Sequence, residues 1–189
     1  MKTIKQIIFT LILLLAANAS VDAQGWIQDR RAMYSAGVGV SQVVFLPARY
    51  YNISYRSQSF NMNIAGEYRA HRYIGLGWQT GLNIFTNGRY YSPSDNVYYY
   101  STIVGMPMGF KANFHILEAT SASVKDKLDV YAGFNVGGGP AFHTGPEGGS
   151  YGFFYAGPQA GIRYWFDSRV AVFSEIGWGA SIFNVGLTF

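Results

Sequence analysis

The chain has 189 residues and a formal net charge of +4; only 13% of its residues are charged, whereas 49% are hydrophobic and 17% aromatic. This length suits one domain of ordinary size, and the charge excess is too small to indicate a nucleic-acid-binding protein. The absence of Cys excludes disulfides and thiolate metal sites. After the amino terminus, no continuous apolar run is long enough for a transmembrane helix. A chain this apolar must therefore alternate its apolar residues, as a lipid-facing β-barrel does.

The amino terminus has the features of an export signal. Two lysines supply positive charge ahead of an almost unbroken apolar run, Ile7–Leu15, and small residues follow it. The run is too short to cross a bilayer as a helix, which takes roughly 20 residues. We expect cleavage after Ala23, so that residues 1–23 are a signal peptide and residues 24–189 form one outer-membrane β-barrel domain.

In the rest of the chain, large apolar residues alternate with small or polar ones. Within Arg72–Phe85, for example, Ile74, Leu76 and Trp78 alternate with Gly75 and Gly77. This period of two predicts β-strands, each near or above the roughly 9–11 residues with which a tilted strand crosses a membrane. The expected strands are Met33–Val44, Phe60–Arg69, Arg72–Phe85, Tyr99–Asn113, Leu128–Gly138, Gly152–Phe166, Arg169–Gly179 and Phe183–Phe189.

The residues opposite the apolar face are mostly Gly, Ser, Asn and Gln. A soluble sandwich or a lipocalin-like barrel also alternates, but it exposes many Lys and Glu residues on one face, and this chain has too few. A face of small residues suits a narrow barrel interior. We therefore predict an all-β fold: an eight-stranded antiparallel up-and-down transmembrane β-barrel after a cleaved signal peptide.

An even number of strands places both mature termini on the periplasmic side of the outer membrane. Tyr and Trp residues near the strand ends predict aromatic belts, and the Tyr-rich outer loops are a candidate contact surface for an extracellular ligand or protein. The expected outer connections are Leu46–Ser59, Thr86–Tyr98, Gly139–Tyr151 and a tight turn near Ala180. The expected periplasmic turns are Ala70-His71, Phe114–Lys127 and Asp167-Ser168.

Six charged residues fall on the same face as the glycines. An isolated buried charge costs several kcal/mol, so a balanced set inside a narrow barrel predicts an internal salt-bridge network; a charged pore constriction is the alternative. An eight-stranded barrel is just wide enough for side chains to fill, which favours a filled lumen. The predicted lumen charge network consists of Glu67, Arg69, Lys111, Asp129, Arg163 and Glu175.

The end of the chain reads as a strand that stops at an aromatic carboxyl terminus. Phe183, Val185, Leu187 and Phe189 alternate with small or polar residues, with no turn after them. We interpret these four residues as an assembly signal. We expect Phe189 to face lipid at the periplasmic rim, and the strand to close the sheet against the first one.

No set of residues indicates catalysis, a cofactor or a metal ion. His71 and His115 are expected in periplasmic turns and His143 in an outer loop, so the three histidines do not converge. His143 and Glu147 form at most a weak acid–base pair in a Gly-rich loop. The sequence therefore assigns no catalytic, cofactor-binding or metal-ligating residue and predicts a protein that is not an enzyme.

Three segments resemble strands of the small, porin-like outer-membrane β-barrel family of Bacteroidota and, more distantly, the OmpX/OmpA-type eight-stranded barrels: Ile103–Lys111, Phe173–Gly179 and Asn184–Phe189. The resemblance implies an outer-membrane location, contact with outer-membrane lipid, and insertion by the barrel assembly machinery with the terminal strand as recognition element. It implies no single activity and no catalytic residue. The leading hypothesis is a non-enzymatic structural, surface-interaction or accessory protein. A small channel or transporter is the alternative, followed by a lipid-modifying or proteolytic barrel enzyme.

Overall fold

The computed structural model describes residues 32–41, 58–92, 96–119, 127–144 and 149–189. The predicted signal peptide, Glu147 and most of the predicted loop Leu46–Ser59 lie outside these ranges. None of the helices in the described ranges is long and apolar enough to cross a membrane. The described elements are β1 (Ala32–Val40), β2 (Gln58–His71), β3 (Ile74–Ser92), β4 (Val97–Gly105), β5 (Met108–His115), a short 3-10 helix η3 (Leu117–Ala119), β6 (Leu128–Thr144), β7 (Gly149–Trp165), β8 (Ala171–Gly177) and β9 (Phe183–Thr188).

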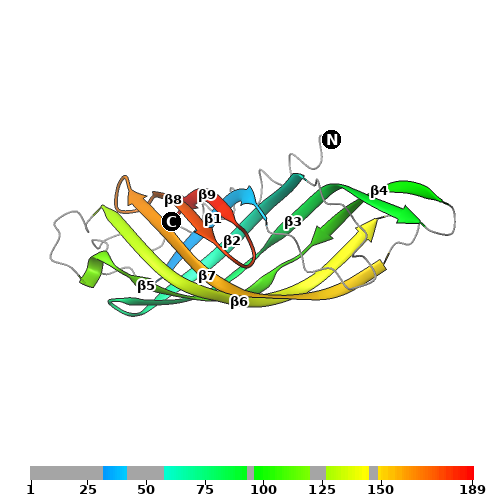
Figure 1. The fold of residues 1–189 in the computed structure, drawn as a ribbon. Coiled ribbons are helices and arrows are strands. Elements are labelled where there is room, and N and C mark those ends of the chain that lie inside the picture. Colours follow the sequence, from blue (N-terminus) through cyan, green and yellow to red (C-terminus); the bar gives the residue numbers. More distant parts are fainter. Residues whose placement is uncertain (1–31, 42–57, 93–95, 120–126, 145–148) are drawn as a thin grey trace.

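These strands form a closed antiparallel ring, seen from the side in Figure 1. Strands that follow one another in the chain pair with each other, except for β4 and β5, and β9 returns to pair with β1, where Val185 lies opposite Val38. Because the ring is closed, its backbone hydrogen-bonding groups are satisfied within the sheet and no open edge runs along its full length.

The strands β4 and β5 are two parts of one strand. Both pair with β3 and with β6, and the interruption lies at Met106 and Pro107. Pro107 has no N–H to donate, but its carbonyl still accepts a hydrogen bond from the Gly81 N–H at 3.0 Å. The ring therefore has eight strands, which confirms the predicted eight-stranded antiparallel up-and-down barrel.

At one end of the barrel the strands are longer than the sequence predicts. Most of Thr86–Tyr98 and Gly139–Tyr151, predicted as outer loops, belongs to the hairpins β3–β4 and β6–β7. The ladder of the first hairpin still pairs Tyr91 with Tyr98. The loop prediction is wrong because the antiparallel ladder continues through both segments, one of which is rich in Tyr, a strong strand former. Both hairpins reach well beyond β1, β8 and β9 on the right of Figure 1.

At the opposite end, two predicted turns are shifted. Ala70 and His71 end β2, so the turn lies at Arg72 and Tyr73 instead. The segment Phe114–Lys127 also begins later than predicted, because its first two residues continue β5. This shift places His115 in a strand, where its side chain is buried.

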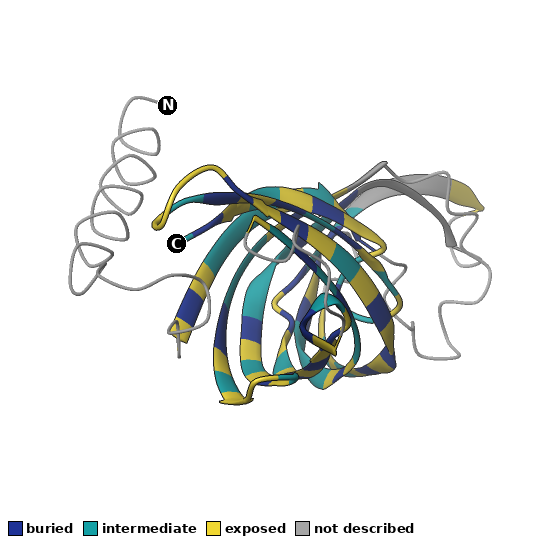
Figure 2. Ribbon diagram, turned by 90° about the vertical axis from the view of Figure 1, so that its left-hand side faces the viewer, coloured by how far each residue is buried: buried dark blue, intermediate teal, exposed yellow. Residues whose placement is uncertain are grey.

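Burial alternates along the strands, but in the sense opposite to that of a soluble protein, as the banding in Figure 2 shows. Outward-facing side chains are large, apolar and exposed; Phe110 is 72% exposed, Phe154 65% and Ile176 60%. The buried side chains of the interior include many polar and charged ones. The barrel thus presents its apolar residues outward and its charges inward.

Glycines on the inner face make room for aromatic rings. A Cβ atom on Gly161 would lie 2.4 Å from the Tyr131 ring, and one on Gly37 would lie 2.8 Å from Cζ of Phe173. An eight-stranded barrel has space for only some large inward side chains. These glycines are therefore what allows the rings to lie across the interior.

Candidate functional site: a buried charge network

Five strands contribute the charged side chains of the interior. Strand alternation turns them inward, and the antiparallel register sets them opposite one another; Asp129 on β6, for example, is directly opposite Arg163 on β7. The structure places all six residues of the predicted network on the inner face, and their side chains are at most 8% exposed. It brings them together in two linked groups.

Arg163 is at the centre of the first group. Its Nη1 donates to Oδ2 of Asp129 at 2.9 Å, and its Nη2 lies 3.7 Å from Oε2 of Glu67. The guanidinium also lies over the Tyr131 ring, 4.8 Å from its centroid. Two carboxylates and an aromatic face thus compensate one fully buried charge, as a buried arginine requires.

His115 joins the same two carboxylates. Its Nδ1 lies 2.8 Å from Oδ1 of Asp129 and its Nε2 lies 3.0 Å from Oε1 of Glu67, and the side chain has no exposed surface. The sequence predicts a turn at His115, and this prediction is wrong because β5 continues through it. The signal was present: Lys111, Asn113 and His115 occupy alternate positions of one strand and therefore share a face.

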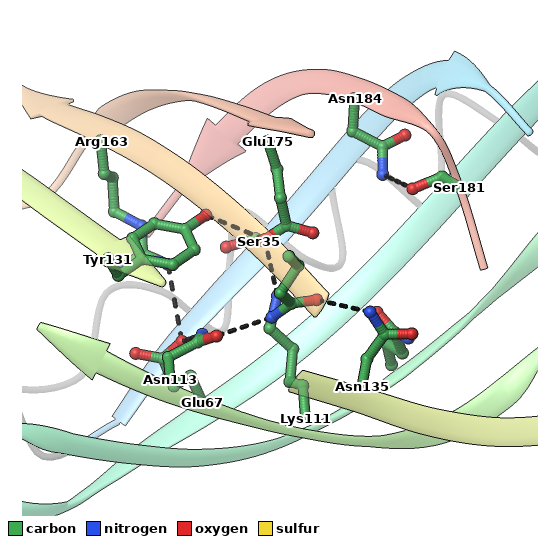
Figure 3. Close-up of polar contacts among 12 residues, drawn as sticks. Ser35, Glu67, Lys111, Asn113, Tyr131, Asn135, Arg163, Glu175, Ser181 and Asn184 are labelled. Carbon is green, nitrogen blue, oxygen red and sulfur yellow. Dashed lines mark hydrogen bonds and ion pairs between the residues drawn. The ribbon is translucent and has the colours of Figure 1, made fainter. Parts of the chain in front are cut away.

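The second group is formed around Glu175. Its Oε2 accepts a hydrogen bond from Nζ of Lys111 at 2.9 Å and another from the Tyr131 hydroxyl at 2.9 Å, as seen in Figure 3. Tyr131 therefore touches both groups, through its hydroxyl here and through its ring at Arg163. Sequence reasoning missed it, although it follows Asp129 by one alternation on the same face of β6.

Arg69 extends the network to the end of the barrel. Its Nη1 lies 3.2 Å from Oε1 of Glu118 and its Nη2 lies 3.6 Å from Oδ2 of Asp129. Glu118 is part of η3, which follows β5 and turns this carboxylate inward. No periodic signal could have found Glu118, because the residue lies outside the strands.

A chain of amides continues from the charges toward the middle of the barrel. Asn113 donates to Glu67, Gln159 Nε2 donates to Asn113 Oδ1 at 2.6 Å, and Asn135 Nδ2 donates to Gln159 Oε1 at 3.1 Å. These residues lie on β2, β5, β6 and β7. Since an amide can both donate and accept hydrogen bonds, these side chains link one strand to the next across the interior.

The network links strands and offers little for catalysis. Its carboxylates are engaged by Arg, Lys, His, Asn or Tyr donors, and in the described part of the chain no group of His, Asp and Glu side chains has the arrangement of a metal site. His71 is exposed at the β2–β3 turn, whereas His143 is buried on β6. The structure thus does not bring the three histidines together.

The carboxyl-terminal residues close the ring. Phe183, Val185 and Leu187 point outward from β9 and are between 39% and 43% exposed. Phe189 follows β9, and its backbone exchanges two hydrogen bonds with Tyr34, of 2.8 and 3.0 Å. The ladder between the first and last strands therefore runs to the final residue.

No protein-family model and no curated protein matches this chain. Among solved structures it is similar to Ail, the attachment invasion locus protein of Yersinia pestis, in complex with the heparin analogue sucrose octasulfate: 12% identity, a TM-score of 0.45, and coverage of 84% of this chain and 95% of that one. A second structure of Ail gives 12% identity, a TM-score of 0.43 and the same coverage. The backbone structure of the outer-membrane protein Ail in a phospholipid bilayer nanodisc gives 10% identity and a TM-score of 0.34, covering 84% of this chain and 98% of that one.

Proposed function

We propose that this chain is a non-enzymatic outer-membrane β-barrel with a structural or surface-interaction role. The observation that carries the proposal is the distribution of polarity around the closed ring: every strand exposes large apolar side chains outward, while the six charged side chains of the network are buried inside. A soluble monomer rarely exposes an apolar patch larger than a few hundred Å². A closed ring with an apolar exterior matches what a bilayer requires of a β-protein.

The interior supports a filled lumen rather than a channel. Ion pairs and amides connect β2, β5, β6, β7 and β8 across the barrel, and Tyr131 lies between the two charged groups. Opening a path for ions would require these contacts to break. The charges therefore serve to hold the strands together.

Planar-bilayer recordings of the refolded mature protein test this reading. The unmodified protein should give no steady openings, and cell fractionation should recover it in the outer membrane. Steady openings that change with Lys111→Ala would overturn the filled lumen and favour a small channel. Recovery in the soluble fraction would overturn the membrane proposal itself.

The proposed contact surface is the extended β3–β4 hairpin. Its ladder pairs Tyr90 with Tyr99 and Tyr91 with Tyr98, so tyrosines occupy consecutive positions on both strands. With both mature termini periplasmic, this hairpin faces outward from the cell. Replacing residues 90–99 by a short Asn-Gly turn should leave the barrel folded, with heat-modifiable migration on a gel, and abolish capture of an extracellular partner. Loss of the folded gel form would show that the hairpin is needed for folding instead.

In this proposal residues 1–23 direct export and are removed. The barrel assembly machinery then recognises the final strand, with Phe183, Val185, Leu187 and Phe189 facing lipid. The outward position of the first three and the pairing of Phe189 with Tyr34 support this role.

A further inference from the structure

Two arginines near the β2–β3 turn, Arg69 and Arg72, contact different groups of Glu118. Arg69 binds the carboxylate of Glu118, at 3.2 Å, whereas Nη2 of Arg72 donates to the backbone carbonyl of Glu118, at 3.3 Å. Among the described residues, no carboxylate lies within ion-pair distance of Arg72. Its side chain is exposed, so it presents an uncompensated positive charge at the end of the barrel.

The guanidinium of Arg72 is nevertheless held in place. It lies over the ring of Tyr73, 4.9 Å from the centroid, while the Glu118 carbonyl holds one of its nitrogens. The Tyr73 ring is itself packed 6.3 Å from the ring of Phe114. A planar fork of donors that is already oriented loses little entropy on binding a phosphate.

Arg72 lies beside the start of the apolar exterior. Ile74 and Phe114, 44% and 46% exposed, begin the outward apolar surface beside it. Arg72 lies in the turn two residues before Ile74, the first residue of β3. If the exterior meets hydrocarbon, this guanidinium lies at the depth of the lipid headgroups.

We propose that Arg72, Tyr73 and Phe114 form a binding site for a glycerophospholipid. The guanidinium binds the phosphodiester, Tyr73 holds the guanidinium, and an acyl chain lies against Phe114 and Ile74. Charge-assisted bidentate hydrogen bonds are the strongest that an arginine makes with a phosphate. This site rests on the proposed membrane location and specifies which lipid group the barrel holds, and where.

Arg169 supplies a matched control. It is an exposed arginine in the turn between β7 and β8, at the same end of the barrel, and its backbone N–H donates to Oδ1 of Asp167 at 2.6 Å. None of the described rings lies under its guanidinium at the close range found for Arg72 on Tyr73. Arg169→Gln therefore removes an equal charge from the same end without removing the oriented fork.

The experiment is native mass spectrometry of the refolded mature protein, taken from vesicles of phosphatidylglycerol and phosphatidylcholine. Arg72→Gln should insert normally, judged by heat-modifiable migration, but retain phospholipid about tenfold less well, the size of effect expected for one charge-assisted contact. Arg72→Lys should be intermediate, because it keeps the charge and loses the fork. Arg169→Gln should match the unmodified protein.

Equal retention by Arg72→Gln and the unmodified protein would overturn the site, as would equal losses in Arg72→Gln and Arg169→Gln. Equal retention of diacylglycerol, which has no phosphate, would also overturn it. Displacement of the lipid by inorganic phosphate would show an anion site rather than a lipid site. If the unmodified protein fails to enter vesicles, the membrane proposal fails together with the site; normal insertion without a difference between variants overturns the site alone.

Discussion

The Lys111–Glu175 pair allows the buried network to be tested energetically. Its two charged atoms are 2.9 Å apart, and both side chains are almost completely buried. Lys111→Met leaves the Glu175 carboxylate without its cation, and Glu175→Gln leaves the ammonium without its anion. Breaking a buried pair by removing one partner costs about 3–5 kcal/mol. We expect about 3 kcal/mol for Lys111→Met, because the Tyr131 hydroxyl still donates to Glu175.

The double variant Lys111→Met/Glu175→Gln tests whether the two charges stabilise each other. It leaves no unpaired charge, and the amide oxygen of the introduced glutamine still accepts the hydrogen bond from Tyr131. If each single variant costs about 3 kcal/mol, additive effects would give about 6 kcal/mol for the double variant. We expect the double variant to cost only about 3 kcal/mol. The difference, about 3 kcal/mol, is a coupling energy near the upper end of measured values. Urea unfolding of the refolded barrel in vesicles, followed by Trp fluorescence, gives these free energies.

Lys127→Met is the control for this cycle. Lys127 is exposed just before β6, and its replacement should change stability by no more than about 0.5 kcal/mol. Additive effects in the double variant would show that the two charges do not stabilise each other. Single variants as mild as the control would show that water reaches both groups, which would refute the argument for a filled interior.

Three further variants test the two faces and the closure of the barrel. Gly161→Ala should destabilise by about 1–3 kcal/mol because its Cβ would clash with Tyr131, whereas Gly152→Ala, which has nothing within 4 Å, should be neutral in the same unfolding assay. Phe110→Arg should cost about 2–4 kcal/mol in vesicles if this outward side chain meets the middle of the bilayer; a neutral effect would argue against lipid contact. Deleting Phe189 removes two backbone hydrogen bonds to Tyr34 and should lower the amount of barrel recovered from outer membranes; normal recovery would contradict the proposed assembly role.

The sequence could predict the ring because the rule of alternation is local. Each outward Phe, Ile or Trp is separated from the next by one small or polar residue, so the face of Lys111 or Glu175 follows from its position alone. The antiparallel neighbours follow from the connections between successive strands. These two facts place six charges in one narrow interior before any distance is known.

The ends of the strands could not be predicted in the same way. His115 falls within the connection predicted over Phe114–Lys127, and its role depends on β5 continuing as far as that residue. Glu118 enters the network from a 3-10 helix, and Tyr131 enters because Gly161 on the next strand leaves room for its ring. Alternation gives the faces of His115 and Tyr131, but where β5 ends, how much room the Tyr131 ring has and where Glu118 lies depend on tertiary contacts.

Quenching of single tryptophans by lipid measures most directly which face meets the membrane. Trp78 is 42% exposed on the outer face, whereas Trp165 is 1% exposed in the interior. Two variants of the mature protein, each retaining one of these residues and carrying Phe in place of the other tryptophans, are refolded into vesicles with brominated acyl chains. We predict strong quenching of Trp78 by the brominated lipid and little quenching of Trp165. Quenching of Trp78 by aqueous iodide but not by the lipid, or equal quenching of both residues by the lipid, would contradict a barrel with its apolar face in the bilayer and its charges inside.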